Sequence, residues 1–258
     1  MDAFVTAGGI PGPEEPLYAE AGGRPKALID IAGRPMIQWV LDALGGAARV
    51  GQVVLVGLPP DSGLTCARPL HFLPNQGGML ANIQAGMARL RELNPQAERA
   101  LAVSSDIPGI TPGMVDWLID SAQQSDHDLY YCVIDRQTME QRFPASRRSY
   151  VRLRDAEVCG GDMNVVRPSL AADPALWNRL VGARKNALRQ ASMVGWDLVL
   201  LLLLRRLTLA QAEERISRRL GFRGHVLRCP HAEIGMDIDK PHQLELLQQD
   251  LAARRAAA

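Results

Sequence analysis

Hydrophobic positions in the first half of the chain alternate between short continuous runs and longer stretches with helical spacing. The continuous runs predict strands at residues 3–6, 52–57, 71–73 and 99–104. The stretches between them carry apolar side chains three or four positions apart and predict helices over 35–48, 77–93 and 112–123. This alternation favours an α/β fold with a mixed, mostly parallel sheet that helices cover on both faces.

The second half of the chain is less regular. Its patterns predict strands at 128–134, 149–153, 157–166, 224–228 and 233–238, a mainly helical stretch over 173–220 and a closing helix over 241–255. The apolar run Leu198–Leu204 is far shorter than the roughly 20 residues that cross a bilayer, and it predicts a buried helix. We expect a single domain over residues 1–258, with a helical insert at about 173–220.

The amino-acid composition bears on the kind of molecule that the protein binds and on its location. The chain has 258 residues, of which 47% are hydrophobic and 22% charged, as in folded globular proteins. Its net charge of +1 gives no electrostatic argument for a nucleic acid or a membrane as partner. The four cysteines are scattered without a CxxC pair, and no secretory signal pattern is visible. A cytoplasmic location is therefore expected, while the oligomeric state stays open.

Chemically unusual residues follow three of the predicted strands directly. Gly8-Gly9 follows the first strand, Ser105-Asp106 follows the fourth, and Asp237 and Asp239 lie at the end of a late one. Ligands of open α/β sheets bind beyond the carboxyl ends of the strands. The sequence therefore predicts a site where these three strand ends meet.

A long loop rich in glycine and proline separates the first strand from the first helix. Gly8 and Gly9 at its start allow backbone N–H groups to approach a phosphate or a base, and Lys26 near its end offers a compact cation. The segment is neither a P-loop nor a GxGxxG fingerprint. Taken alone, it is more typical of a surface loop with a solvated lysine.

Three carboxylates are candidate ligands of a divalent cation. Asp106 ends an apolar strand and is followed by Ile-Pro, and Asp237 and Asp239 occupy alternate positions of a predicted strand. Mg²⁺ prefers one or two such carboxylates together with substrate phosphates. The alternative for Asp106 is a turn or helix cap, and Asp239 suits the N-cap of the closing helix, which makes Asp237 the better metal candidate of the late pair.

A second polar segment precedes the predicted helix at 77–93. Gly77-Gly78 at its start suits an anion or a flat base, and Asn75 and Asn82 offer hydrogen bonds to a ligand. An ordinary loop between a strand and a helix is an equally good interpretation. The arginine pairs, Arg147-Arg148 among them, favour solvated surface over a nucleic-acid path.

These features together resemble a known family. The segments "TAGG…RPKALIDIAGRPMIQWVLDAL", "SSDIPGITP" and "GMDIDKPHQLELLQQDL" are similar to the signatures of nucleotidyltransferases related to molybdenum-cofactor guanylyltransferase, the MobA-like NTP transferases. The detailed resemblance covers residues 2–124 and 233–251. It implies a three-layer α/β/α, Rossmann-like (GT-A type) fold with a mixed seven-stranded sheet, an NTP and Mg²⁺ as ligands, and release of pyrophosphate.

The resemblance also implies roles for individual residues. Lys26 would stabilise the α-phosphate, and Asp106 and Asp237, with Asp239 as the further candidate, would hold Mg²⁺. The candidate nucleotide-binding residues are Ala7, Gly8, Gly9, Asn75, Gly77, Gly78, Asn82 and Ser105.

One departure from the family pattern concerns the opening loop. The family usually follows Ala-Gly-Gly with a short segment whose arginine clamps the phosphates, whereas this chain has the proline-rich stretch Ile10–Tyr18, which contains two acids. Arg24, which precedes Lys26 by two positions, is the candidate replacement for that arginine.

The expected reaction is transfer of an NMP unit from an NTP to a small phosphorylated or hydroxylated acceptor. Alignment of the reactants and neutralisation of negative charge account for most of such catalysis. Arg184 and Lys185 in the helical insert are candidate contacts for an anionic acceptor, with a solvated turn as the alternative. A nucleotide-sugar glycosyltransferase of related fold and a nucleotide-binding protein without turnover remain rival functions.

Overall fold

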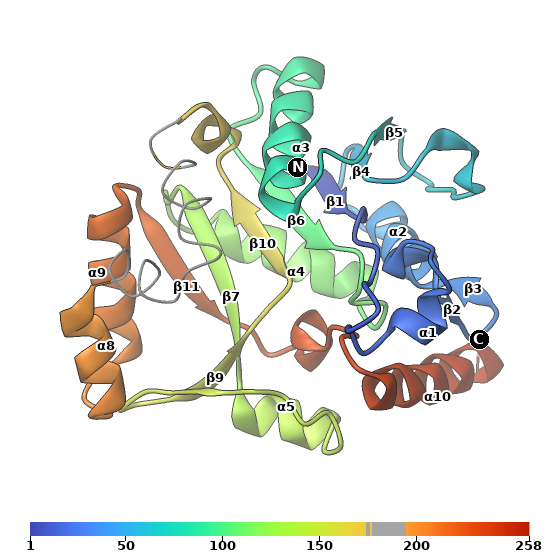
Figure 1. Ribbon diagram of the computed structural model, residues 1–258. Coiled ribbons are helices and arrows are strands. Elements are labelled where there is room, and N and C mark those ends of the chain that lie inside the picture. Colours follow the sequence, from blue (N-terminus) through green and yellow to red (C-terminus); the bar gives the residue numbers. More distant parts are fainter. Residues whose placement is uncertain (174–175, 177–194, 258) are drawn as a thin grey trace.

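The computed structural model of the chain describes residues 1–173, 176 and 195–257, and Figure 1 shows its arrangement. A twisted sheet crosses the molecule, with helices on both faces (Figure 1). The two predicted acceptor residues, Arg184 and Lys185, lie outside the described residues.

Within the described residues, nine strands form the main sheet in the order β5-β4-β1-β6-β10-β7-β9-β8, with β11 also paired to β7. Their bounds are β1 Asp2–Thr6, β4 Val53–Val56, β5 Leu70–Leu73, β6 Ala100–Ser104, β7 Leu129–Asp135, β8 Val151–Arg152, β9 Glu157–Gly160, β10 Met163–Val166 and β11 Gly224–Arg228. A small separate sheet pairs β2 Asp30–Ile31 with β3 Arg34–Pro35.

The α-helices of the described residues are α1 Tyr18–Ala21, α2 Met36–Gly46, α3 Met79–Leu93, α4 Pro112–Ala122, α5 Arg136–Arg142, α8 Trp196–Leu203, α9 Leu209–Leu220 and α10 Pro241–Ala257. Short 3-10 helices occur at Lys26–Leu28, Pro60–Ser62, Pro168–Ala172 and Ala232–Gly235.

Side chains of β1 divide the core into two layers. Val5 belongs to the larger cluster, which it shares with residues of α2 and α4. Phe4, its neighbour in the strand, packs with Met87 and Leu90 of α3 on the opposite face. The predicted three-layer α/β/α arrangement is therefore confirmed.

The sheet is mixed, but the prediction that it is mostly parallel is wrong. The strands β5, β4, β1 and β6 run parallel, as does β11 on β7. The pairings β10–β6, β10–β7, β7–β9 and β8–β9 are antiparallel. A parallel neighbour needs a crossover of about a dozen residues or more, and β8, β9 and β10 follow one another too closely for that. The seven strands implied by the family resemblance are fewer than the nine described here.

Two predictions for single elements are also wrong. Residues 233–238 do not form a strand, because both edges of β7 are already paired and the chain instead makes the 3-10 helix Ala232–Gly235 and an extended link to α10. The run Leu198–Leu204 is helical but only partly buried: Leu198 is 4% exposed, whereas Leu203 is 75% exposed. No helix within the described residues has the length and apolar character to span a membrane.

Candidate active site

The site begins where β1 and β6 end side by side. The two strands pair in parallel register, with Thr6 opposite Ser104, so that the residues after them leave the sheet at the same edge. The Ser105 N–H donates to the Thr6 carbonyl over 3.3 Å and continues this pairing beyond the strands. The carboxyl end of the sheet therefore brings Ala7-Gly8-Gly9 close to Asp106.

A cavity of about 400 Å³ opens at this edge. All eight candidate nucleotide-binding residues and two of the three candidate catalytic residues, Lys26 and Asp106, line it. The full lining is Thr6, Ala7, Gly8, Gly9, Lys26, Ala27, Asn75, Gly77, Gly78, Met79, Asn82, Ser104, Ser105 and Asp106. The structure thus brings these residues together, while their contact with a nucleotide stays a prediction.

Two glycines allow the chain segments around this cavity to approach one another. Gly57 follows β4 with φ of +112°, and a Cβ there would lie 2.3 Å from the Gly8 nitrogen. A Cβ on Gly8 would in turn lie 2.7 Å from Cγ of Asn75. Gly57 was not among the predicted site residues, although a glycine directly after a buried strand was a visible signal.

Asn75 and Asn82 shape the wall of the cavity. Asn75 Nδ2 donates to the Gly8 carbonyl at 2.8 Å, and its Oδ1 accepts from Gly77 N at 3.0 Å. Asn82 Oδ1 accepts from Gln76 N at 2.7 Å. These bonds hold the loop before α3 against the end of β1, so the two amides have a structural role whether or not they also contact a ligand.

The long opening loop returns to its starting point. Lys26 N donates to the Gly9 carbonyl at 2.8 Å, and Leu17 and Ala21 are buried beneath the loop. Arg24 is exposed and is not among the residues that line the cavity. The structure therefore joins the two ends of the loop, and the role of Arg24 as a phosphate contact stays a prediction.

The Lys26 ammonium lies between two carboxylates. Its Nζ is 2.7 Å from Asp106 Oδ2 and 2.6 Å from Asp239 Oδ1. Burial acts to lower the pKa of Lys26, but Asp106 and Asp239 outweigh it and the pKa is raised overall. Lys26 therefore stays a cation in the neutral range.

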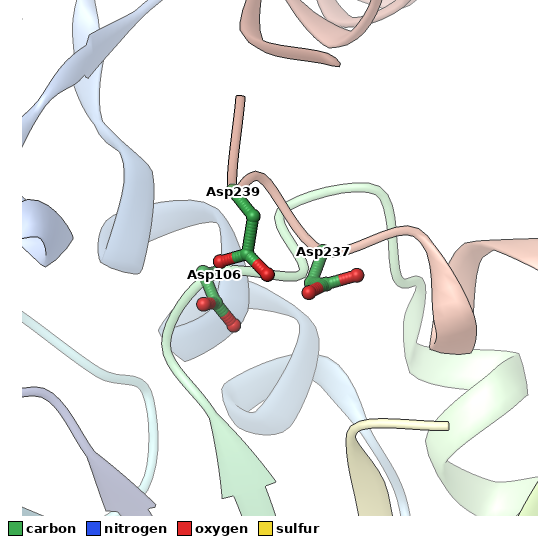
Figure 2. Close-up of side chains that lie close together, drawn as sticks. All are labelled: Asp106, Asp237 and Asp239. Atoms are coloured by element: carbon green, nitrogen blue, oxygen red, sulfur yellow. The ribbon is translucent and has the colours of Figure 1, made fainter. Parts of the chain in front are cut away.

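Figure 2 shows the three candidate metal ligands gathered between the end of β6 and the link to α10. Asp106, Asp237 and Asp239 each offer an oxygen, and these oxygens lie within 4.8 Å of one another. The Ile238 N–H donates to the Asp106 carbonyl at 3.0 Å and fixes the link to the end of β6. Among the described residues, the Asp239 carboxylate bonds Lys26 rather than capping α10, so the capping alternative finds no support.

A fourth charged group, Arg148, completes the cluster. Its Nη1 forms an ion pair with Asp237 Oδ1, yet this oxygen is buried without a partner in hydrogen-bonding geometry among the described residues. Hard oxygen ligands with unmet acceptor capacity suit Mg²⁺. The donor set thus fits a divalent cation. The prediction that placed Arg148 on solvated surface is wrong, because the side chain is only 15% exposed.

Asp162 is a further neighbour that was not predicted from the sequence. Its carbonyl accepts from Ser104 N at 2.9 Å, and its N–H donates to the Ile234 carbonyl at 2.8 Å. Burial raises the pKa of Asp162 to about 7, and the Asp106 carboxylate adds to the rise. The signal in the sequence was the Gly160-Gly161-Asp162 turn, which only the folded sheet places beside β6.

A family comparison agrees with this geometry. The family described as MobA-like NTP transferase domain matches residues 19–220. The chain belongs to this family. The matched part of this MobA-like NTP transferase begins inside the opening loop and includes Lys26 and Asp106.

Two curated relatives of this MobA-like NTP transferase match only part of the chain. The 2-C-methyl-D-erythritol 4-phosphate cytidylyltransferases of two Thermus thermophilus strains are 35% identical over 106 residues, which is 40% of this chain and 45% of the relatives. The match thus spans less than half the length of these curated relatives.

Two solved structures extend the likeness over nearly the whole chain. A hypothetical transferase from Thermus thermophilus is 36% identical, with 94% of this chain and 98% of the other covered and a TM-score of 0.81. CMP:2-keto-3-deoxy-manno-octonic acid synthetase complexed with CTP shares the fold at 15% identity, with 98% and 99% covered and a TM-score of 0.60.

Proposed function

We propose that this MobA-like NTP transferase is a Mg²⁺-dependent nucleotidyltransferase. It joins an NMP unit from an NTP to a small phosphorylated or hydroxylated acceptor and releases pyrophosphate. The observation that carries the proposal is the Lys26 ammonium held between Asp106 and Asp239, directly beside the glycine-lined cavity.

The cavity supports the nucleotide part of the proposal. Its volume of about 400 Å³ is in the range of small-molecule sites. Gly8 and Gly9 leave their backbone N–H groups accessible to phosphate oxygens, since neither has a side chain of its own. CTP is the first donor to test, because the matched curated relatives are cytidylyltransferases and a neighbour in the fold was solved with CTP.

The acidic cluster supports the metal. Asp106 and Asp237 would hold Mg²⁺, with Asp239 as a further oxygen ligand. When bound, Mg²⁺ supplies positive charge that stabilises the transferring phosphoryl group.

Lys26 would provide the remaining positive charge at the α-phosphate. Its ammonium is already oriented by two carboxylates and keeps its proton, so little reorganisation accompanies the reaction. A phosphorylated acceptor is ionised near neutral pH and needs no general base. Ser104 Oγ donates to Asp106 Oδ1 at 2.6 Å and holds that carboxylate in place.

The test is pyrophosphate release with each NTP, Mg²⁺ and a panel of phosphorylated and hydroxylated acceptors. We expect Asp106→Asn to lower turnover by at least about 100-fold and Lys26→Ala by a similar factor. Glu98→Gln is the matched control. Glu98 is an exposed carboxylate just before β6, at the amino end of that strand, whereas the site lies at its carboxyl end. It should leave turnover unchanged.

Other outcomes would favour the rival functions. NTP binding without pyrophosphate for any acceptor would indicate a binding protein, and sugar transfer from a nucleotide sugar would indicate a glycosyltransferase. If Arg24→Ala alone abolished turnover while Lys26→Ala did not, the exposed Arg24 would have to be the phosphate contact, and the role given to Lys26 would be wrong.

A further inference from the structure

A separate cavity of about 430 Å³ is lined mainly by polar and charged side chains, and we call it the arginine pocket. Its charged lining residues are one glutamate, Glu140, and four arginines: Arg136, Arg147, Arg148 and Arg152. The first of these arginines belongs to α5, the last to β8, and the other two to the loop between them. Within the described chain, no residue lines both this pocket and the glycine-lined cavity.

Two sets of contacts connect the arginine pocket to the acidic cluster. Arg148 lines the pocket and forms an ion pair with Asp237. The carbonyl of Ser146, another lining residue, accepts from Gln243 Nε2 at 3.4 Å, and Gln243 Oε1 accepts from Asp239 N at 2.9 Å. Gln243 is 2% exposed, so this connection lies inside the protein. The arginine pocket and the acidic cluster are therefore neighbours.

Carboxylates neutralise part of the positive charge of the arginine pocket. Arg136 pairs with Glu140 at 2.8 Å and with Glu157 at 2.9 Å. Arg152 also lies 3.2 Å from Glu157. Arg147 differs from these two, because it is exposed and has no ion-pair partner among the described residues. Its guanidinium is therefore the charge of the pocket that is available to a ligand.

The backbone at Arg147 has an unusual conformation. Its φ is +49°, in the left-handed region that residues with a side chain rarely adopt. The preceding turn is fixed, because Ser146 N donates to the Phe143 carbonyl at 3.0 Å and Phe143 is 1% exposed. Backbone strain of this kind is found most often where a site requires it. The conformation suits a binding role for Arg147.

Two further polar groups of the pocket residues have unused hydrogen-bonding capacity. The Tyr150 hydroxyl and Arg148 Nε are buried, and neither has a partner in hydrogen-bonding geometry among the described residues. Buried donors normally find a partner. The guanidinium of Arg136 lies 5.4 Å from the centroid of the Tyr150 ring and holds that ring against α5. An anion in the adjacent pocket would supply the missing acceptor after a small movement of these side chains.

We propose that the arginine pocket binds an unreacting phosphate of the acceptor, while a different oxygen of the acceptor attacks the NTP. This inference rests on the proposed nucleotidyltransferase function and specifies its acceptor class, a small molecule with a phosphate and a separate nucleophilic oxygen. Guanidinium groups form charge-assisted hydrogen bonds with phosphate oxygens. Because the pocket and the glycine-lined cavity have separate linings, the phosphate bound here is not the group that meets the α-phosphorus.

The bound phosphate takes no part in the chemical step. The attacking oxygen forms a bond to the α-phosphorus of the NTP. The bond from the α-phosphorus to the oxygen that bridges to the β-phosphorus breaks, and its electron pair leaves with pyrophosphate. A hydroxyl nucleophile releases its proton to water, whereas an ionised oxygen has none to release. The product keeps the phosphate of the arginine pocket as an unchanged monoester.

The first test measures the binding of inorganic phosphate and of acetate by calorimetry, without NTP. We expect phosphate to bind more tightly than acetate, and Arg147→Ala to weaken phosphate at least about tenfold. Arg147→Lys keeps the charge and should weaken it less. The matched control is Arg91→Ala, because Arg91 is an exposed arginine of α3 that lines neither cavity. Lys26→Ala should retain the binding that depends on Arg147.

The second test measures turnover with acceptors that release pyrophosphate, each compared with its analogue that lacks the phosphate remote from the nucleophile. Arg147→Ala should raise KM for the phosphorylated acceptor at least about tenfold and leave kcat within about twofold, because the contact is the same in the ground and transition states. The KM for the NTP should not change. Phosphorus NMR of the product should still show the phosphomonoester.

Phosphate binding that Lys26→Ala removes and Arg147→Ala leaves unchanged would overturn the proposal, since the anion would then lie in the glycine-lined cavity. Acetate binding as tight as phosphate binding would also overturn it, as would a product in which the acceptor phosphate itself is joined to the NMP.

Two outcomes separate the arginine pocket from the transferase function. Pyrophosphate release with an unchanged KM for the acceptor in Arg147→Ala would overturn the pocket and retain the transferase. Phosphate binding that depends on Arg147, with no pyrophosphate from any NTP and acceptor, would retain the pocket as an anion site and overturn both the transferase function and the acceptor role.

Discussion

Gly57 has no functional group, yet it determines how closely three segments of the candidate site approach one another. Its positive φ and the short distance from an added methyl group to Gly8 exclude any larger side chain without movement of the loop. A glycine of this kind contributes to a site because it has no side chain that would keep the neighbouring segments apart.

We expect Gly57→Ala to lower the free energy of unfolding by about 1–3 kcal/mol and to weaken NTP binding. Gly63→Ala is the matched control, because Gly63 also has a positive φ of +71° but no described atom within 4 Å of an added Cβ. It should cost only about 1 kcal/mol and leave binding unchanged. Urea denaturation and nucleotide titration measure both effects, and equal losses for the two variants would contradict the packing argument.

For single residues, the sequence predicted a place in the site where an apolar strand directly precedes the residue. Gly8-Gly9 and Asp106 closely follow apolar strands, so their place at the sheet edge was predictable. Arg148 and Asp162 do not directly follow a predicted strand. Both reach the cluster only through the packing of β7, β9 and β10, which one-dimensional periodicity does not encode.

Among whole elements, α8 shows the limit of hydrophobicity as a guide. Seven consecutive apolar residues predicted burial, but a helix has several faces and only one of them meets the sheet. Residues 233–238 show a similar limit. Their alternation of apolar and polar residues predicted a strand, but both edges of the neighbouring β7 are already paired with other strands. Whether a segment forms a helix or a strand was largely predictable, whereas the pairing partner and the direction of each strand were not.

The two faces of α8 should differ in their contribution to stability. Leu198→Ala removes a side chain that is 4% exposed and should cost about 2–5 kcal/mol in free energy of unfolding. Leu203→Ala changes a side chain that is 75% exposed and should stay within about 0.5 kcal/mol. Urea midpoints for the two variants test this, and similar losses would mean that Leu203 is covered in solution.

The junction of β7 with β11 should respond to acid. Burial lowers the pKa of His127 from its ordinary value of 6.5, and the stacked His225, whose ring centroid is 4.9 Å away, adds to the effect. Above pH 6.5 the imidazole is neutral in both states, so the stability is fully present. As the pH falls below that value, the unfolded chain takes up the proton first and stability is lost.

Comparison of variants isolates this contribution, because Asp162 acts in the opposite direction. The raised pKa of Asp162 means that the folded state binds its proton first, which favours folding as the pH falls through about 7. We therefore expect His127→Gln to lose less stability than the unchanged protein between about pH 7 and pH 5. His71→Gln, on β5 at the other side of the sheet, is the control and should follow the unchanged protein.

For the molecule as a whole, the acidic cluster joins parts of the chain that are far apart in sequence. Lys26 comes from the opening loop, Asp106 from the centre of the sheet and Asp239 from the link to the last helix. A ligand that binds this cluster should therefore stabilise the whole fold and not only one loop.

Addition of Mg²⁺ at about 100 times its dissociation constant should raise the free energy of unfolding by about 2.7 kcal/mol. The increase should be absent in Asp237→Asn, retained in Glu98→Gln and reversed by a chelator. Thermal unfolding with and without Mg²⁺ measures it, and an equal increase in Asp237→Asn would place the cation elsewhere.

The distance along the chain between Asp106 and Asp237 also has a consequence for biosynthesis. A ribosome exposes the first strands, the glycine loop and Asp106 while more than a hundred residues remain to be translated. The nascent chain can therefore form the glycine-lined cavity before its set of carboxylates is complete. A product of premature termination between Asp106 and Asp237 would keep the residues of the glycine-lined cavity but lack two of the three carboxylates of the cluster.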